Sequence, residues 1–174
     1  MSLPFWLAMA GWAFTYLNSR ALAKQAEANA IGANVDKMLQ EISDENYKFW
    51  RDANSADQEH TMKCQLFQSF ITFRCNFIEL RIKALRKKCR NRIMWDGNFD
   101  AFETKAITLI AELRDLATLD SEQTNEVSQL QRRRKIMLVN KKTIDLHEIM
   151  SDFILSRFRS VFSFEKNKEE EAPV

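Results

Sequence analysis

The sequence has very few of the residues that interrupt helices. Only three glycines (Gly11, Gly32, Gly97) and two prolines (Pro4, Pro173) occur among its 174 residues. Between these prolines no residue forces a helix to break by removing a backbone donor. Alternating β-branched runs bounded by turn residues, which are typical of strands, are also lacking. The sequence therefore predicts an all-α fold of long helices, with one modest domain after an N-terminal segment.

Charged side chains are missing from the first nineteen residues, and the first charges are Arg20 and Lys24. As a helix this run is about 27 Å long, close to the hydrocarbon core of about 30 Å. Aromatic residues lie near both ends of the run, where membrane interfaces favour them. We therefore expect a single-pass transmembrane helix over residues 1–19. Its membrane-contacting aromatic residues are Phe5, Trp6, Trp12, Phe14 and Tyr16.

Two other interpretations of this segment stay open. Residues 21–23 have the small-x-small pattern of a signal-peptidase site, although no basic residue precedes the apolar run. The second interpretation is a buried helix of a globular domain, although a helix that is apolar on all sides needs a large core around it. Because basic residues follow the run, the positive-inside rule predicts a short outer N-terminus and a cytoplasmic body. The expected location is a bacterial inner membrane.

The chemistry of known enzyme and metal sites is also missing. Cys64, Cys75 and Cys89 lie about 16 Å and 21 Å apart along one helix, too far for a disulfide or a shared metal ion. We interpret them as small core thiols in a reducing compartment. His60 and His147 stand alone, and no glycine-rich nucleotide loop, HExxH motif or nucleophile elbow occurs. We therefore expect a protein that is not an enzyme, with no catalytic residues, cofactor or metal.

The rest of the chain is predicted to be a coiled-coil-like bundle of long helices. An alanine-rich helical neck is expected over 20–42, with Gly32 as its weakest point, and the bundle over 43–165. Capping side chains at 43–46 favour a helix start there, and 95–98 is the clearest turn. Residues 166–174 read as a charged tail.

The segment 57–95 carries two apolar stripes at helical spacing. The first consists of Cys64, Phe67, Ile71, Cys75, Ile78, Ile82 and Leu85. The second consists of Leu66, Phe70, Phe73, Phe77, Leu80 and Ala84. A helix with two apolar stripes contacts two neighbours, so we expect this helix to be central in the bundle.

A row of basic residues runs between these stripes: Lys63, Arg74, Arg81 and Lys88. One interpretation is that they pair with acidic residues of the next helix, because a hairpin at Gly97 brings the acidic side chains of 98–130, such as Glu112, alongside. The other is an anion-binding or partner-binding site, in which Arg74 and Arg81 grip planar oxyanions.

A second basic cluster, Arg132, Arg133, Arg134 and Lys135, is a candidate contact patch for nucleic acid or anionic lipid. No recognition motif or aromatic stacking platform accompanies it, which disfavours nucleic acid as a partner. A solvated or acid-paired helix face is the plainer interpretation.

Charge alternates in blocks along the chain, with 9 Lys/Arg against 2 Asp/Glu over 61–97 and 2 against 7 over 98–130. Such blocks favour antiparallel neighbours that neutralise one another. We interpret the chain as a non-enzymatic scaffold or regulatory subunit of a membrane complex, acting by helix–helix association. Its expected partners are the lipid bilayer and a second copy or another protein in the same membrane. The alternatives are a membrane-active effector that perturbs a bilayer and a soluble module that binds nucleic acid or phosphate.

Overall fold

The computed structural model describes residues 3–52, 59–89, 97–124 and 126–158, and this part of the chain is all-α, as predicted. Four helices follow one another: α1 (Leu3–Asp52), α2 (His60–Cys89), α3 (Gly97–Thr118) and α4 (Gln129–Phe158). No strand occurs within these ranges.

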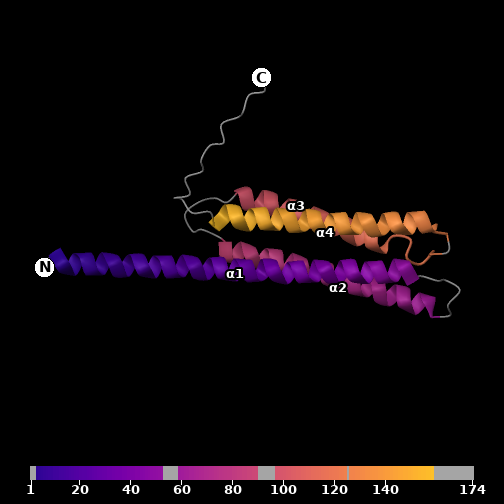
Figure 1. The fold of residues 1–174 in the computed structure, drawn as a ribbon, viewed down its shortest axis with the longest axis horizontal. Helices are drawn as coiled ribbons and strands as arrows, with labels where there is room; N and C mark the ends of the chain where they lie inside the picture. Colours follow the sequence, from indigo (N-terminus) through magenta and orange to yellow (C-terminus); the bar gives the residue numbers. More distant parts are fainter. Residues whose placement is uncertain (1–2, 53–58, 90–96, 125, 159–174) are drawn as a thin grey trace, which may run out of the picture.

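The helices form an up-and-down bundle in which each helix runs antiparallel to the next (Figure 1). Helices α1 and α3 each pack against both α2 and α4, so the contacts close into a ring. Each helix therefore has one inward face, which is the arrangement of a four-helix bundle.

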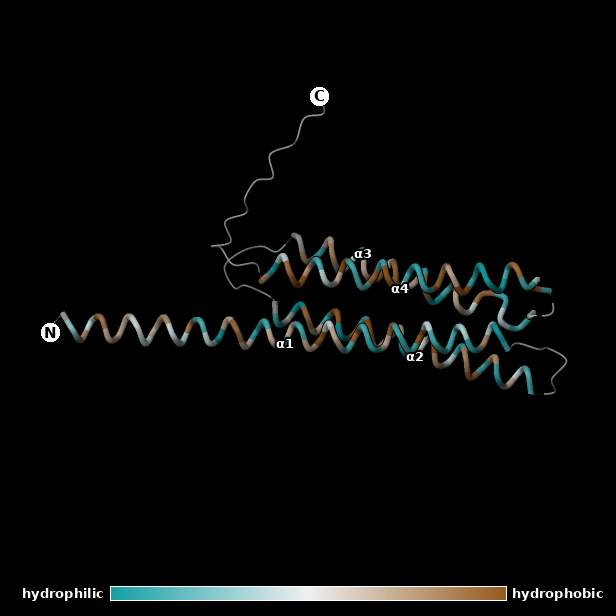
Figure 2. The backbone as a smooth tube through the Cα atoms, viewed as in Figure 1, coloured by the Kyte–Doolittle hydropathy of each residue, from teal (hydrophilic) through white to brown (hydrophobic). Residues whose placement is uncertain are grey.

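The core consists of the apolar stripes that the four helices turn inward. Figure 2 shows hydrophobic and hydrophilic residues alternating along the helices of the bundle. Stacked rings join neighbouring helices: Phe49 of α1 lies on Phe67 of α2 with centroids 4.0 Å apart, and Phe102 of α3 lies on Phe153 of α4 at 4.3 Å. Such pairs add to the free energy gained by burying the rings.

Helix α1 extends beyond the bundle at its N-terminal end (Figure 1). Residues 4–23 are all exposed, and the first buried residue of α1 is Ala28. We call residues 4–23 the N-terminal projection. Helix α1 is continuous through the boundaries expected at 19 and at 42, so the N-terminal segment, the expected neck and the first part of the bundle share one helix. The capping residues at 43–46 lie inside it.

No helix of the described ranges is both long enough and apolar enough to cross a membrane. The structure therefore does not support the transmembrane helix expected over 1–19. The physical reason is the length of the apolar part: Leu3 to Leu17 covers about 22 Å, whereas a hydrocarbon core is about 30 Å thick. Asn18 and Ser19 are polar and do not extend it.

Gly32, expected to be the weakest point of the neck, lies where α1 and α4 approach closely. A Cβ atom added to Gly32 would lie 3.0 Å from Cδ1 of Ile154. The missing side chain thus makes room for Ile154, which is buried. The predicted charged tail over 166–174 and the bundle boundary at 165 lie outside the described residues.

Candidate functional site

The first stripe of α2 faces the core, as its spacing predicts. All seven of its residues are buried: Cys64, Phe67, Ile71, Cys75, Ile78, Ile82 and Leu85. Burial raises the pKa of Cys75 to about 12, because the thiolate loses its hydration there. Cys64 and Cys75 are therefore core thiols, and the side chain of Cys89 lies outside the described residues.

Half of the second stripe of α2 lies on the outside of the bundle. Leu66, Phe73 and Leu80 are 62%, 59% and 60% exposed, whereas Phe70, Phe77 and Ala84 are partly buried at the edge of the core. Helix α2 does contact two neighbours, α1 and α3, but the expectation that it is central is wrong, because a ring of four helices gives each helix only one inward face. We call the second stripe (Leu66, Phe70, Phe73, Phe77, Leu80 and Ala84) the outer seam.

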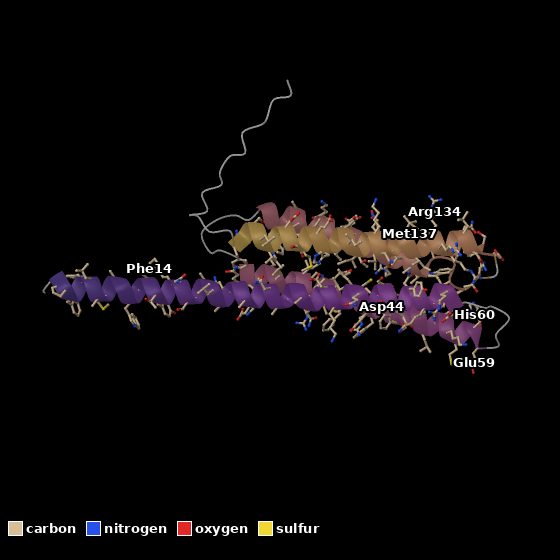
Figure 3. The ribbon with its side chains drawn as sticks, viewed as in Figure 1. Phe14, Asp44, Glu59, His60, Arg134 and Met137 are labelled. Atoms are coloured by element: carbon tan, nitrogen blue, oxygen red, sulfur yellow. The ribbon has the colours of Figure 1, made fainter. Side chains whose placement is uncertain are left out.

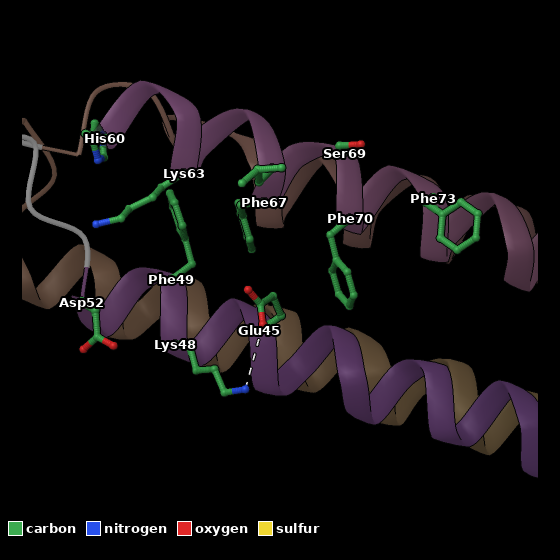
Figure 4. Close-up of a pocket in the computed structure, with 11 residues that line it drawn as sticks. Glu45, Lys48, Phe49, Asp52, His60, Lys63, Phe67, Ser69, Phe70 and Phe73 are labelled. Carbon is green, nitrogen blue, oxygen red and sulfur yellow. Dashed lines mark ion pairs between the residues drawn. The ribbon is translucent and has the colours of Figure 1, made fainter. Parts of the chain in front are cut away.

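A groove of about 840 Å³ runs beside the outer seam between α1 and α2 (Figure 4). Phe67 and Phe70 of α2 point across it toward Phe49 and Glu45 of α1. The groove thus combines an aromatic wall with a charged rim. The whole lining consists of Glu45, Lys48, Phe49, Asp52, His60, Lys63, Leu66, Phe67, Ser69, Phe70 and Phe73.

The basic row of α2 lies on the side that faces α1. Arg74 pairs with Glu41 at 2.7 Å, and Lys88 pairs with Glu27 at 2.7 Å. Lys63 lies 3.9 Å from Glu59, one turn earlier in the chain. Inter-helix pairing therefore holds for two of the four basic residues, but their acidic partners come from α1 rather than from the acidic block 98–130.

The acidic block pairs with other basic residues. Arg86 of α2 contacts Asp100 at 2.9 Å and Glu103 at 3.0 Å across the α2–α3 connection. Glu112 pairs with Lys142 of α4 at 2.6 Å. The predicted hairpin of α2 and α3 thus forms. Its ion pairs are made by Arg86, a residue that sequence spacing alone did not single out.

Arg81 differs from the rest of the basic row. Its guanidinium lies 4.9 Å from the ring centroid of Phe77, and its Nε is buried without a hydrogen-bond partner. Among the described residues it makes no ion pair. Arg74 similarly lies 5.3 Å from the ring of Phe70. Two guanidinium groups therefore rest on aromatic rings of the outer seam, as cation–π contacts.

The N-terminal projection exposes all of its aromatic side chains. The five aromatic residues predicted to contact a membrane are 49–73% exposed. Figure 3 shows Phe14 on the part of α1 that has no other helix beside it. Trp12 and Tyr16 stack with centroids 6.3 Å apart. A helix that is apolar all round is ordinarily covered by protein or by lipid.

The cluster 132–135 is divided between two roles. Arg132 donates to the carbonyl oxygens of Thr124 (2.6 Å) and Val127 (3.1 Å), and Lys135 pairs with Asp120 at 3.0 Å. Arg133 and Arg134 are exposed (Figure 3 labels Arg134). Half of the predicted patch therefore fixes the α3–α4 connection.

A buried polar cluster at the start of α2 is a feature that sequence reasoning missed. His60 is 8% exposed, and its Nε2 lies 3.1 Å from Oγ1 of Thr124 and 3.3 Å from Sγ of Cys64. The Cys64 thiol donates to the carbonyl oxygen of Ser121 at 2.9 Å. These contacts tie α2 to the α3–α4 connection. Within the described ranges, no group of three or more His, Cys, Asp or Glu side chains is placed to hold a metal ion.

Comparisons with protein-family models, with curated proteins and with solved structures find no match for this chain. The described residues carry two exposed apolar surfaces, the N-terminal projection and the outer seam.

Proposed function

We propose that this protein is a non-enzymatic helical scaffold that is held at a bilayer and acts by helix–helix association. The observation that carries the proposal is the coexistence of two exposed apolar surfaces on one helical body. Contiguous apolar surface of this kind on a soluble domain marks an interaction site.

The N-terminal projection supplies the attachment to lipid. Covering a large apolar side chain contributes about 1.5–3 kcal/mol, so several aromatic residues together favour the bilayer strongly. Arg20 lies near the C-terminal end of the projection and Lys24 directly follows it, and both match the anionic headgroups of a cytoplasmic leaflet. In this proposal the projection enters the bilayer from the side on which the bundle lies, which is the cytoplasmic side of a bacterial inner membrane.

The outer seam supplies the contact with another protein. Its exposed residues are apolar and its flanks are polar or basic, which is the division of an interface into an apolar centre and a polar rim. A helical partner that covers the seam would remove Leu66, Phe73 and Leu80 from water.

Flotation with lipid vesicles tests the attachment. The full chain should float with vesicles of phosphatidylethanolamine and phosphatidylglycerol, and the double variant Trp6→Glu/Phe14→Glu should stay at the bottom of the gradient. Both residues are exposed, so the bundle should keep its helix content by circular dichroism. Met137→Glu on α4 is the matched control, because Met137 is equally exposed and lies outside both surfaces.

A wild-type chain that does not float would contradict the proposal. Leakage of a trapped dye on addition of the protein would instead favour a membrane-active effector. Steeply salt-dependent binding of nucleic acid that is lost in Arg133→Ala/Arg134→Ala would favour a nucleic-acid-binding module.

A further inference from the structure

We propose that the outer seam of α2 pairs in parallel with the outer seam of a second copy of this chain, as a two-stranded coiled coil. The inference rests on the proposed function, because it names the partner that the scaffold binds. Spacing, flanking residues and the position of α1 each support it.

The spacing of the seam is that of a coiled coil. Its six residues alternate in steps of four and three, so Phe70, Phe77 and Ala84 take one heptad position, and Leu66, Phe73 and Leu80 take the other. In the usual notation these are the a and d positions. A strict period of 3.5 residues is the pattern of a seam that packs against another helix, whereas a bilayer places no demand on the period.

The residues beside the seam fit a second copy. On the side toward α1 the e positions include Arg74 and Arg81, and on the other side the g positions include Ser69 and Asn76. In a parallel, in-register pair each g residue contacts the e residue of the following heptad in the other helix. This contact brings Asn76 of one copy to Arg81 of the other.

The pairing gives Arg81 an acceptor from the other copy. Arg81 makes no ion pair among the described residues and its side chain is partly exposed, so its guanidinium can donate to the carbonyl oxygen of the Asn76 side chain. Ser69 likewise supplies a hydroxyl acceptor beside Arg74. A further e residue, Lys88, would lie opposite Lys83 of the other copy. The ion pair of Lys88 with Glu27 at 2.7 Å offsets the repulsion between these two like charges.

The position of α1 selects the parallel orientation. Arg74 borders the seam and pairs with Glu41, so α1 lies directly beside the seam on one side of α2. In an antiparallel pair the two α1 helices would lie on the same side of the interface, and their N-terminal projections would point in opposite directions. In a parallel pair they lie on opposite sides, and each α2 enters the groove between α1 and α2 of the other copy (Figure 4). Both N-terminal projections then point in one direction, as attachment to one bilayer requires.

Sedimentation velocity of the full chain in a mild detergent tests the pairing. The wild type should be a dimer, and Phe73→Glu/Leu80→Glu should raise the dissociation constant at least about 100-fold, because two large apolar contacts become buried charges. Both side chains are exposed, so helix content should not change. Gln65→Glu/Thr72→Glu adds the same two charges to exposed positions of α2 outside the seam and should leave the dimer intact. A monomeric wild type, or a dimer that survives the seam variant, would overturn the inference.

Cysteine crosslinking tests the orientation. In a chain carrying Cys89→Ser, the single variants Leu66→Cys and Leu80→Cys should each form a disulfide with themselves, whereas Thr72→Cys should not. Crosslinks that form only when Leu66→Cys and Leu80→Cys chains are mixed would show an antiparallel pair and overturn the parallel arrangement.

Vesicle flotation separates this inference from the proposed function. A chain that floats but is monomeric in detergent contradicts the coiled coil and leaves the bilayer attachment standing. A chain that is dimeric but does not float contradicts the attachment and leaves the pairing through α2 standing.

Discussion

Arg74 of α2 and Glu41 of α1 form an ion pair with 2.7 Å between Nη2 and Oε2, and both side chains are about one-third exposed. The pair crosses the α1–α2 interface beside the outer seam. Because the guanidinium also lies over the ring of Phe70, the pair fixes the wall of the groove as well as the spacing of the two helices.

Removing either partner of this pair should destabilise the bundle. We expect Arg74→Ala and Glu41→Ala each to lower the free energy of unfolding by about 1–2 kcal/mol, since a half-buried charge is left without its partner. Urea unfolding of both single variants and the double variant gives the coupling energy. Lys48→Ala is the control, because its exposed pair with Glu45 is 4.0 Å long. Strictly additive effects of Arg74→Ala and Glu41→Ala would contradict the pairing.

Gly32 and Ile154 should be energetically coupled. Alanine favours a helix over glycine by about 1 kcal/mol, but its Cβ would meet Cδ1 of Ile154 at 3.0 Å. We expect Gly32→Ala to change the free energy of unfolding by less than about 0.5 kcal/mol in the wild type and to stabilise an Ile154→Val background by about 1 kcal/mol, because valine lacks that atom. An identical effect of Gly32→Ala in both backgrounds would disprove the steric explanation.

The two halves of the cluster 132–135 should respond differently to mutation. Arg132→Ala removes hydrogen bonds to the carbonyl oxygens of Thr124 and Val127 and should lower the free energy of unfolding by about 1–2 kcal/mol. The side chain of Arg133 is exposed, so Arg133→Ala should change the free energy of unfolding by less than about 0.5 kcal/mol. Thermal or urea unfolding of the two variants makes the comparison, and equal losses would show that Arg132 has no special structural role.

Cys75 should make the stability of the protein depend on alkaline pH. Its pKa is raised to about 12 in the folded chain from an ordinary value of 9.0, so the folded state keeps a proton that the unfolded state releases. The stabilisation is complete below pH 9 and is lost as the pH rises toward 12. Between pH 8 and pH 10 the wild type should lose about 1 kcal/mol relative to Cys75→Ala, as measured by urea unfolding. Parallel pH profiles of the two proteins would refute this.

The periodicity of apolar residues in the sequence was sufficient to predict that the chain forms helices and which face of α2 is buried. The first stripe is buried at every position because residues spaced by three and four lie on one side of a helix. The second stripe has the same kind of periodicity but faces outward. A helical pattern shows that a face is apolar, whereas only the arrangement of the other helices shows whether the chain itself covers that face.

The contacts of individual side chains could not be predicted in the same way. One interpretation of the basic row paired it with the next helix in sequence. Helix α2 has two neighbours, however, and the angular position of Arg74 and Lys88 selects α1. His60 and Thr124 are separated by 64 residues and are joined by a single pair of atoms. No local pattern encodes such a contact, because it depends on the path of the α3–α4 connection.

The continuity of α1 has a mechanical consequence. The helix spans 50 residues, or about 75 Å, without a proline after its first turn. The N-terminal projection is therefore rigidly connected to the part of α1 that packs in the bundle. A tilt of the projection by about 10° would displace the far end of a rigid α1 by roughly 10 Å. A force that reorients the N-terminal projection therefore also moves the part of α1 that forms one wall of the groove beside α2.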